Sequence, residues 1–218
     1  MNFSIDYLGF NVANVSFERD NESIVINTRS TRFAGYFTYS FDNTYRISID
    51  SLFTPIIYQK HIEQKKYTEN SITVYDFENM EAVFYDMHND IQLLYDIRHD
   101  TRDFFSTLYY LRTLDLSQEH TMTVDAAGKL WTVNTRLRGY EQLSTHLGLR
   151  QTIRIEVSFE EFDDTPKIRS DIFTNNIVNP NNTLHIWFTN DDQKFPIKTQ
   201  YNMKPFNIQW TLKSISLP

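Results

Sequence analysis

The sequence contains no cysteine, only five glycines and no long apolar run. The absence of cysteine excludes disulfides, thiolate zinc sites and a cysteine nucleophile. The glycines form no phosphate-cradling loop. No segment approaches the roughly 20 consecutive apolar residues that a membrane-spanning helix requires, so we expect no transmembrane segment. These absences remove most cofactor classes, and we expect no cofactor.

The charge of the chain argues against binding to nucleic acids. The formal net charge is -7, whereas a nucleic-acid-binding surface concentrates lysine and arginine. Two short basic stretches, residues 59–66 and 135–141, are interrupted by acidic or apolar residues. They predict solvated strand faces.

The N-terminus shows no export signal. The opening "MNFSIDYLGF" has neither a basic region nor an apolar core of the kind that a signal peptide needs. Strand-like alternation begins almost at residue 2. Met1 is therefore either a native start or a replacement for a removed signal, and the sequence leaves both alternatives open.

Alternation of apolar and polar residues with a period of two dominates the chain and predicts β-strands. The predicted strands cover residues 5–7, 15–17, 23–29, 35–41, 44–50, 55–63, 71–77, 120–141 (a hairpin), 151–162, 183–189, 196–204 and 206–216. The hairpin is expected to turn at Ala126, Ala127 and Gly128. Residues 163–182, rich in Asn, Asp and Pro, are predicted to form a long loop. We expect residues 1–218 to form a single β-rich domain.

One segment has helical periodicity instead. Residues 100–116 are predicted to form a long central helix, with Asp100 as its N-cap and Asp103 in its first turn. Its apolar residues recur at helical spacing, namely Phe104, Leu108 and Leu111 on one face with Phe105 and Tyr109 beside them.

One sequence pattern occurs twice in the chain. "DSLFTPIIYQ" (residues 50–59) and "DDQKFPIKTQ" (residues 191–200) share Asp, Pro, Ile and Gln at the same spacing. In each copy a strand leads into a polar turn, and a proline begins the next strand. Proline has no backbone N–H, and at this position none is needed for the hydrogen bonds between strands. We expect Asp50 and Asp191 to bond backbone amides in these turns and to have no catalytic role.

Four stretches together carry a family resemblance. "DFFSTLYYLRTLDL", "LRGYEQLSTHLG", "IWFTNDDQKFPIKTQ" and the opening "IDYLGFNVANVSF" resemble the bacterial exported proteins grouped as domain of unknown function 3108. The hairpin with its Asp turn and Pro-led strand is also similar to LolA-like lipoprotein carriers.

These resemblances imply a mainly β fold: a strongly curved antiparallel sheet, or open barrel, that wraps one central helix. They also imply a periplasmic or otherwise exported location and no catalysis. The family itself implies no activity for particular residues.

Few side chains are candidates for catalysis or metal binding. The histidines have no HExxH spacing, and His88 and His99, although near three aspartates, are expected in surface loops. Paired acids occur at Glu160, Glu161, Asp163 and Asp164. Because adjacent strand residues point to opposite faces, Glu160 and Glu161 are poorly placed for joint catalysis, so a glycan hydrolase is the least favoured function. We expect no catalytic residues and no metal.

Apolar residues on both faces of one strand suggest a ligand. In residues 183–189, Trp187 is expected on the face opposite the apolar one. A sheet that is covered on one side only has no need of a tryptophan on its solvent-exposed face. The central helix, a partner chain or an apolar ligand would cover it. A curved sheet around one helix often leaves an apolar gap at its mouth.

We therefore expect a non-enzymatic envelope protein that binds a lipid or other apolar small molecule. Its ligand-binding residues are expected at the mouth between the helix and the C-terminal strands, namely Phe105, Tyr109, Trp187 and Trp210. The alternative is a protein-interaction or envelope-assembly module, in which aromatics and open sheet edges dock an envelope protein partner.

Overall fold

The computed structural model describes residues 1–37, 40–203 and 206–216. The strands of the first half are β1 (Asn2–Tyr7), β2 (Phe10–Arg19), β3 (Ser23–Ser30), β4 (Phe41–Ile49), β5 (Pro55–Gln64), β6 (Tyr67–Asp76), β7 (Glu81–Asp86) and β8 (Ile91–Asp96). Those of the second half are β9 (Arg102–Asp103), β10 (His120–Asp125), β11 (Leu130–Thr145), β12 (Gly148–Glu161), β13 (Thr183–Thr189), β14 (Pro196–Met203) and β15 (Phe206–Ser214). Within the same residues the chain forms the helices α1 (Arg32–Phe37), α2 (Phe104–Leu111) and α3 (Ile172–Ile177).

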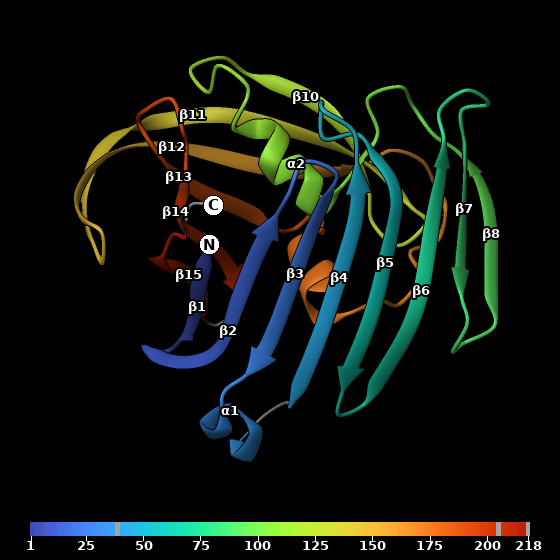
Figure 1. Cartoon of the computed structure of the whole chain (residues 1–218), viewed down its shortest axis with the longest axis horizontal. Helices are drawn as coiled ribbons and strands as arrows, with labels where there is room; N and C mark the ends of the chain where they lie inside the picture. Colours follow the sequence, from blue (N-terminus) through green and yellow to red (C-terminus); the bar gives the residue numbers. More distant parts are fainter. Residues whose placement is uncertain (38–39, 204–205, 217–218) are drawn as a thin grey trace.

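All the strands belong to one sheet, in the order β8-β7-β6-β5-β4-β3-β2-β1-β15-β14-β13-β12-β11-β10-β9. Neighbouring strands are antiparallel except β9 and β10, which are parallel. The first and last strands of the sequence, β1 and β15, are neighbours in the middle of the sheet. The sheet curls on itself without closing (Figure 1), which confirms the predicted mainly β, open-barrel fold.

Strand alternation places the core inside the curl. In β4, Tyr45, Ile47 and Ile49 are buried, while Arg46 and Ser48 are exposed. Figure 1 shows α2 in the hollow of the sheet, between the N-terminal strands and β10–β12. None of the helices in the described part of the chain is long and apolar enough to span a membrane.

The helix at residues 104–111 is shorter than predicted and begins later. Asp103, not Asp100, is its N-cap: Oδ1 of Asp103 accepts hydrogen bonds from the amides of Phe105 (2.8 Å) and Ser106 (3.1 Å). Residues 102 and 103 cannot be helical because they pair with β10 as β9. Asp100 instead accepts a hydrogen bond from the amide of Thr123.

The buried face of α2 also differs from the expected one. Phe105 and Tyr109 are buried, as is Leu111, whereas Phe104 and Leu108 are only partly buried. The ring of Phe105 packs between other aromatic rings of the core, including that of Tyr45 at 4.8 Å. The face centred on Phe105 therefore fills the hollow of the sheet.

Two other expectations were wrong, and two strands were missed. The predicted loop at residues 163–182 contains α3, and most of the described part of the predicted strand at 35–41 is occupied by the end of α1, with residues 38 and 39 outside the described residues. Strands β7 and β8 were not predicted. In β7, exposed Val83 lies between buried Ala82 and Phe84, so its apolar run hides the alternation that marks a strand.

The sequence pattern shared by residues 50–59 and 191–200 forms an Asp turn in both places, as predicted. Oδ1 of Asp50 accepts hydrogen bonds from the amides of Leu52 and Thr54, two and four residues downstream, at 2.8 Å each. Oδ1 of Asp191 accepts them from the amides two and three residues downstream, at 3.0 Å each. The third residue after each aspartate has a positive φ, 60° at Phe53 and 43° at Lys194. The identical spacing therefore reflects a shared turn conformation.

The predicted turn at residues 126–128 is confirmed, and it contacts the far end of the sheet. Gly128 has φ of 74°, and a Cβ built on it would lie 2.8 Å from Cδ1 of Leu93 on β8. The hydroxyls of Tyr75 and Tyr95 both donate to Oδ2 of Asp125 beside this turn. Side-chain contacts thus link β6 and β8 to β10 across the opening of the barrel.

Candidate functional site

The four residues predicted to bind a ligand do not form one site. Trp187 lies opposite Lys198, and Trp210 lies opposite Thr199. Because Lys198 and Thr199 are consecutive residues of β14, the two tryptophans point to opposite faces of the sheet.

Trp187 is covered by its own neighbours on the outer face. It is only 5% exposed. Arg154 and Lys198 flank it on the adjacent strands, and Nζ of Lys198 lies 4.5 Å from the centre of its ring. Its indole nitrogen donates to Oε1 of Glu141 at 2.6 Å. The stems of charged side chains cover this tryptophan, so it requires no ligand or partner.

The other three residues face the interior at different places. Phe105 contacts Tyr45 in the central core, and Tyr109 stacks on Phe53 at 5.8 Å. Trp210 packs edge-on against Phe173 of α3 at 5.4 Å. Trp210 therefore lies beside α3.

An apolar cavity of about 200 Å³ lies between the helices α1 and α3 and the inner face of the sheet. Figure 1 shows α3, drawn in orange, inside the curl behind β3 and β4. The residues that line the cavity are Ile5, Tyr7, Val12, Ala34, Phe41, Ile172, Phe173, Asn176, Tyr201 and Ile208. None of these is charged.

A second, polar pocket of about 220 Å³ adjoins this cavity. The two share Phe41, Ile172 and Asn176. The remaining residues of the polar pocket are Gln64, Lys66, Tyr67, Arg169, Ser170 and Asn175. We call the two together the α3 site.

Helix α3 is fixed to the sheet by a buried carboxylate. Asp171 is the N-cap of α3, and its Oδ1 accepts hydrogen bonds from the amides of Phe173 (2.9 Å) and Thr174 (3.0 Å). The same oxygen accepts a 2.9 Å hydrogen bond from the hydroxyl of Tyr45 on β4. Asp171 thus joins the local conformation of α3 to a strand 126 residues earlier.

Lys60 completes this attachment. Its ammonium group is buried and donates to Oγ of Ser170 at 2.7 Å, with carboxylate oxygens of Glu69 and Asp171 at 3.4 and 3.6 Å. Burial lowers the pKa of Lys60, but the two carboxylates outweigh it and raise that pKa above its ordinary value. Burial likewise raises the pKa of Asp171, but Lys60 and the hydrogen bonds outweigh it and lower that pKa.

The buried ions therefore have a structural explanation, because each charge has a partner. The network holds α3 over the inner face of β4, β5 and β6, and α3 in turn supplies three residues to the apolar cavity. The α3 site depends on this attachment.

Sequence reasoning missed the α3 site because it read residues 163–182 as a loop. A signal was present: Asp171 precedes the apolar pair Ile172 and Phe173, which is typical of an N-cap before a helix. No local pattern, however, indicates that Ile5 and Ile208, from opposite ends of the chain, line the same cavity.

The other chemical candidates are dispersed. Among the described residues, no group of three or more His, Asp or Glu is placed to hold a metal ion. Nε2 of His88 is bonded to the hydroxyl of Thr68. Glu161 pairs with Lys129 at 2.8 Å, while Glu160 accepts a hydrogen bond from Asn134.

Comparison with known proteins places this fold among proteins of unknown function. The family model described as "Protein of unknown function (DUF3108)" matches residues 2–208. No curated protein matches the chain. A solved β-barrel-like protein of domain of unknown function DUF1849 from Brucella abortus is 9% identical with a TM-score of 0.60, over 96% of this chain and 92% of that one. A DUF1089 family protein from Pseudomonas aeruginosa is 10% identical with a TM-score of 0.42, over 86% and 88%.

Proposed function

Since the chain belongs to the DUF3108 family of proteins of unknown function, we propose its function from its own geometry: it binds an apolar molecule in the cavity of the α3 site. The observation that carries this proposal is the lining of the cavity. It consists of aliphatic and aromatic side chains with one amide, that of Asn176, and no charge among the described residues. Apolar pockets with few polar groups are typical of small-molecule sites.

The size of the cavity limits the ligand. Its volume of about 200 Å³ is below the roughly 300–1,000 Å³ of most ligand pockets. It suits one narrow apolar chain better than a bulky or branched molecule. A lipid would place part of one acyl chain there.

We extend the proposal to a non-enzymatic role in the cell envelope. The dispersed acids and histidines support a binding role over a catalytic one. The location is supported by the resemblance to exported proteins, and fractionation of cells that express the complete natural gene would test it. Recovery of the protein with the cytoplasm would contradict the proposed location.

The binding proposal is tested by titration with 1-dodecanol below its aggregation limit. Trp210 packs on Phe173, which lines the cavity, so a bound chain should give a saturable change in tryptophan emission. The change should disappear in Trp210→Phe, while calorimetry of that variant still detects binding.

Filling the cavity provides a matched pair of variants. Ile208→Phe adds bulk to the lining and should weaken binding at least tenfold. Gln209→Phe adds a ring at the next residue of β15, which points to the other face, and should leave binding unchanged. Absence of saturable binding to the unmodified protein, together with a lipid-free native mass spectrum, would overturn the proposal. A heteromeric species in that spectrum would favour the interaction alternative.

A further inference from the structure

The polar pocket beside the apolar cavity is cationic in an acidic protein. The chain has a formal net charge of -7, yet the pocket is lined by Lys66 and Arg169 and by no acidic residue among those described. A further hollow on the same side shares Lys66 and Arg169, adds Lys65 and again has no described acidic lining. The positive charge at this end of the α3 site is thus local and uncompensated by its lining.

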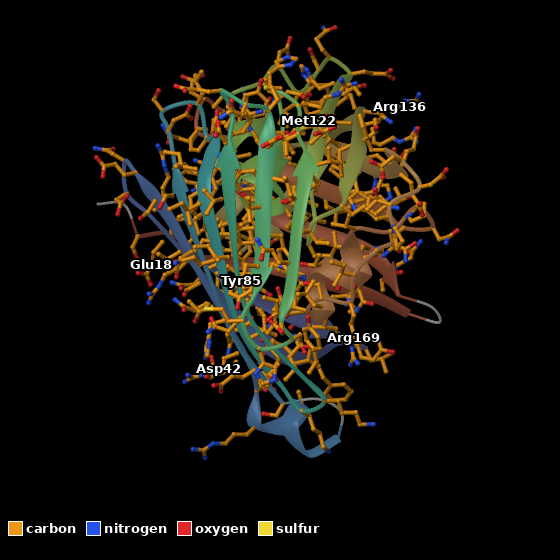
Figure 2. All side chains as sticks on the ribbon, turned by 90° about the vertical axis from the view of Figure 1, so that its right-hand side faces the viewer. Glu18, Asp42, Tyr85, Met122, Arg136 and Arg169 are labelled. Carbon is orange, nitrogen blue, oxygen red and sulfur yellow. The ribbon has the colours of Figure 1, made fainter. Side chains whose placement is uncertain are left out.

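The two cations are available to a ligand. Within the described residues, neither Lys66 nor Arg169 has a carboxylate within 4.0 Å. Arg169 donates to the carbonyl of Lys66 at 3.3 Å, and its guanidinium lies 4.9 Å from the centre of the Tyr67 ring. These contacts hold Arg169 at the rim, on the side of the molecule that Figure 2 faces, and leave other guanidinium donors for an anion.

A third donor in the pocket lacks an acceptor. Nε2 of Gln64 is buried and has no hydrogen-bond partner among the described residues. Gln64 lines the pocket together with Lys66 and Arg169. A buried donor without a partner is costly, and an oxygen of a bound anion would satisfy it.

The pocket and the cavity lie next to each other, with Phe41, Ile172 and Asn176 in the lining of both. A molecule that spans them would place its polar end in the pocket and its apolar end in the cavity. This arrangement matches an amphiphile: an apolar chain on the uncharged side and an anionic group on the cationic side.

We infer that the ligand of the α3 site is a single-chain amphiphile with an anionic headgroup, a carboxylate or a phosphate, held by Lys66, Arg169 and Gln64. This inference rests on the proposed function, because the chain of the amphiphile occupies the apolar cavity. The headgroup accepts charge-assisted hydrogen bonds from the two cations and a hydrogen bond from the amide.

Four probes of equal chain length test the headgroup: laurate, dodecyl phosphate, 1-dodecanol and dodecyltrimethylammonium. Calorimetric titration at pH 8, below the aggregation limit of each probe, should give the anions an affinity about tenfold higher than that of 1-dodecanol. The cation should bind more weakly than 1-dodecanol. Higher affinity for laurate than for dodecyl phosphate would indicate a fatty acid, and the reverse order would indicate a phosphate ester.

Charge-removal variants locate the effect. The double variant Lys66→Gln/Arg169→Gln should bind the anions about as weakly as 1-dodecanol and keep its affinity for 1-dodecanol. The matched double variant Arg150→Gln/Lys213→Gln removes two exposed cations elsewhere and should keep the preference for anions. Added salt should reduce the preference in the unmodified protein, because exposed charges are screened.

Gln64→Leu isolates the buried donor. It should reduce the affinity for laurate without reducing that for 1-dodecanol. The ligand-free variant should be no less stable than the unmodified protein, since Nε2 of Gln64 makes no hydrogen bond to a described residue. A stability loss without a change in laurate affinity would contradict the role of Gln64.

The outcomes separate the two claims. If no probe binds, the proposed function itself fails. If all four probes bind equally, or if the preference for anions survives in Lys66→Gln/Arg169→Gln, the headgroup inference is overturned while apolar binding stands.

Discussion

The hydroxyl of Tyr95 on β8 donates a 2.7 Å hydrogen bond to Oδ2 of Asp125 at the end of β10. These two strands lie near opposite ends of the sheet order. Tyr75 donates to the same oxygen at 2.8 Å, and the amide of Gly128 donates to Oδ1 at 3.0 Å. One buried carboxylate thus links strands on the two sides of the gap in the open barrel.

Replacement of Asp125 should destabilise the barrel strongly. Asp125→Ala leaves the hydroxyls of buried Tyr75 and partly buried Tyr95 without this acceptor, and an unsatisfied buried group costs about 1–3 kcal/mol. We expect a loss of roughly 2–5 kcal/mol in the free energy of unfolding, measured by denaturant titration. Tyr95→Phe removes one donor only and should cost about 1 kcal/mol. Equal effects of the two substitutions would contradict the shared-carboxylate arrangement.

The attachment of α3 predicts a pH-dependent effect of Lys60. Lys60→Met leaves Glu69 and Asp171 buried without their cation, and breaking a buried pair costs about 3–5 kcal/mol. In the unmodified protein the folded-state pKa of Asp171 is lowered, so its stabilisation is present above the unfolded pKa and is lost as the pH falls through the folded pKa.

In Lys60→Met this sign reverses. Without the cation, burial raises the pKa of Asp171, and protonation then stabilises the folded state as the pH falls. The stability difference between the two proteins should therefore be largest near neutral pH and should shrink towards about pH 4. Denaturant titrations across this range measure it, with the exposed Lys213→Met as control. A difference that does not change with pH would mean that Lys60 acts by packing alone.

The buried face of α2 predicts unequal truncation effects. Phe105 is 2% exposed and sits among aromatic rings, so Phe105→Ala should cost about 3–5 kcal/mol. Leu108 is only partly buried, and Leu108→Ala should cost less than about 2 kcal/mol. Thermal and denaturant unfolding provide the comparison, and a larger loss for Leu108→Ala would show that the helix packs by its other face.

The repeated turn predicts tolerance of Asn and intolerance of Ala. Oδ1 of Asp191 accepts two backbone hydrogen bonds and one from Thr189. An asparagine oxygen can accept the same bonds, so Asp191→Asn should change stability by less than about 0.5 kcal/mol, whereas Asp191→Ala should cost about 1–2 kcal/mol. The same pair at Asp50 should behave alike. If Asn is as harmful as Ala, the charge matters and the turn explanation is incomplete.

Several expectations failed where long-range pairing overrode a local pattern. Residues 100–116 have helical spacing, but β9 pairs with β10 and delays the helix until residue 104. Trp187 suggested an uncovered face, yet its cover is provided by Arg154 and Lys198. That cover depends on strand register, which a single strand does not encode.

The sequence by itself determined most of the strands, the Asp turns and the hairpin turn at residues 126–128, because strand alternation and turn chemistry involve residues close together in the chain. The tertiary structure alone decided where the sheet opens, which carboxylates are buried and which residues line the α3 site. Asp171 illustrates the difference. Its role as an N-cap is local, but its partners Tyr45 and Lys60 lie more than 100 residues earlier, and only the curling of the sheet brings them to it.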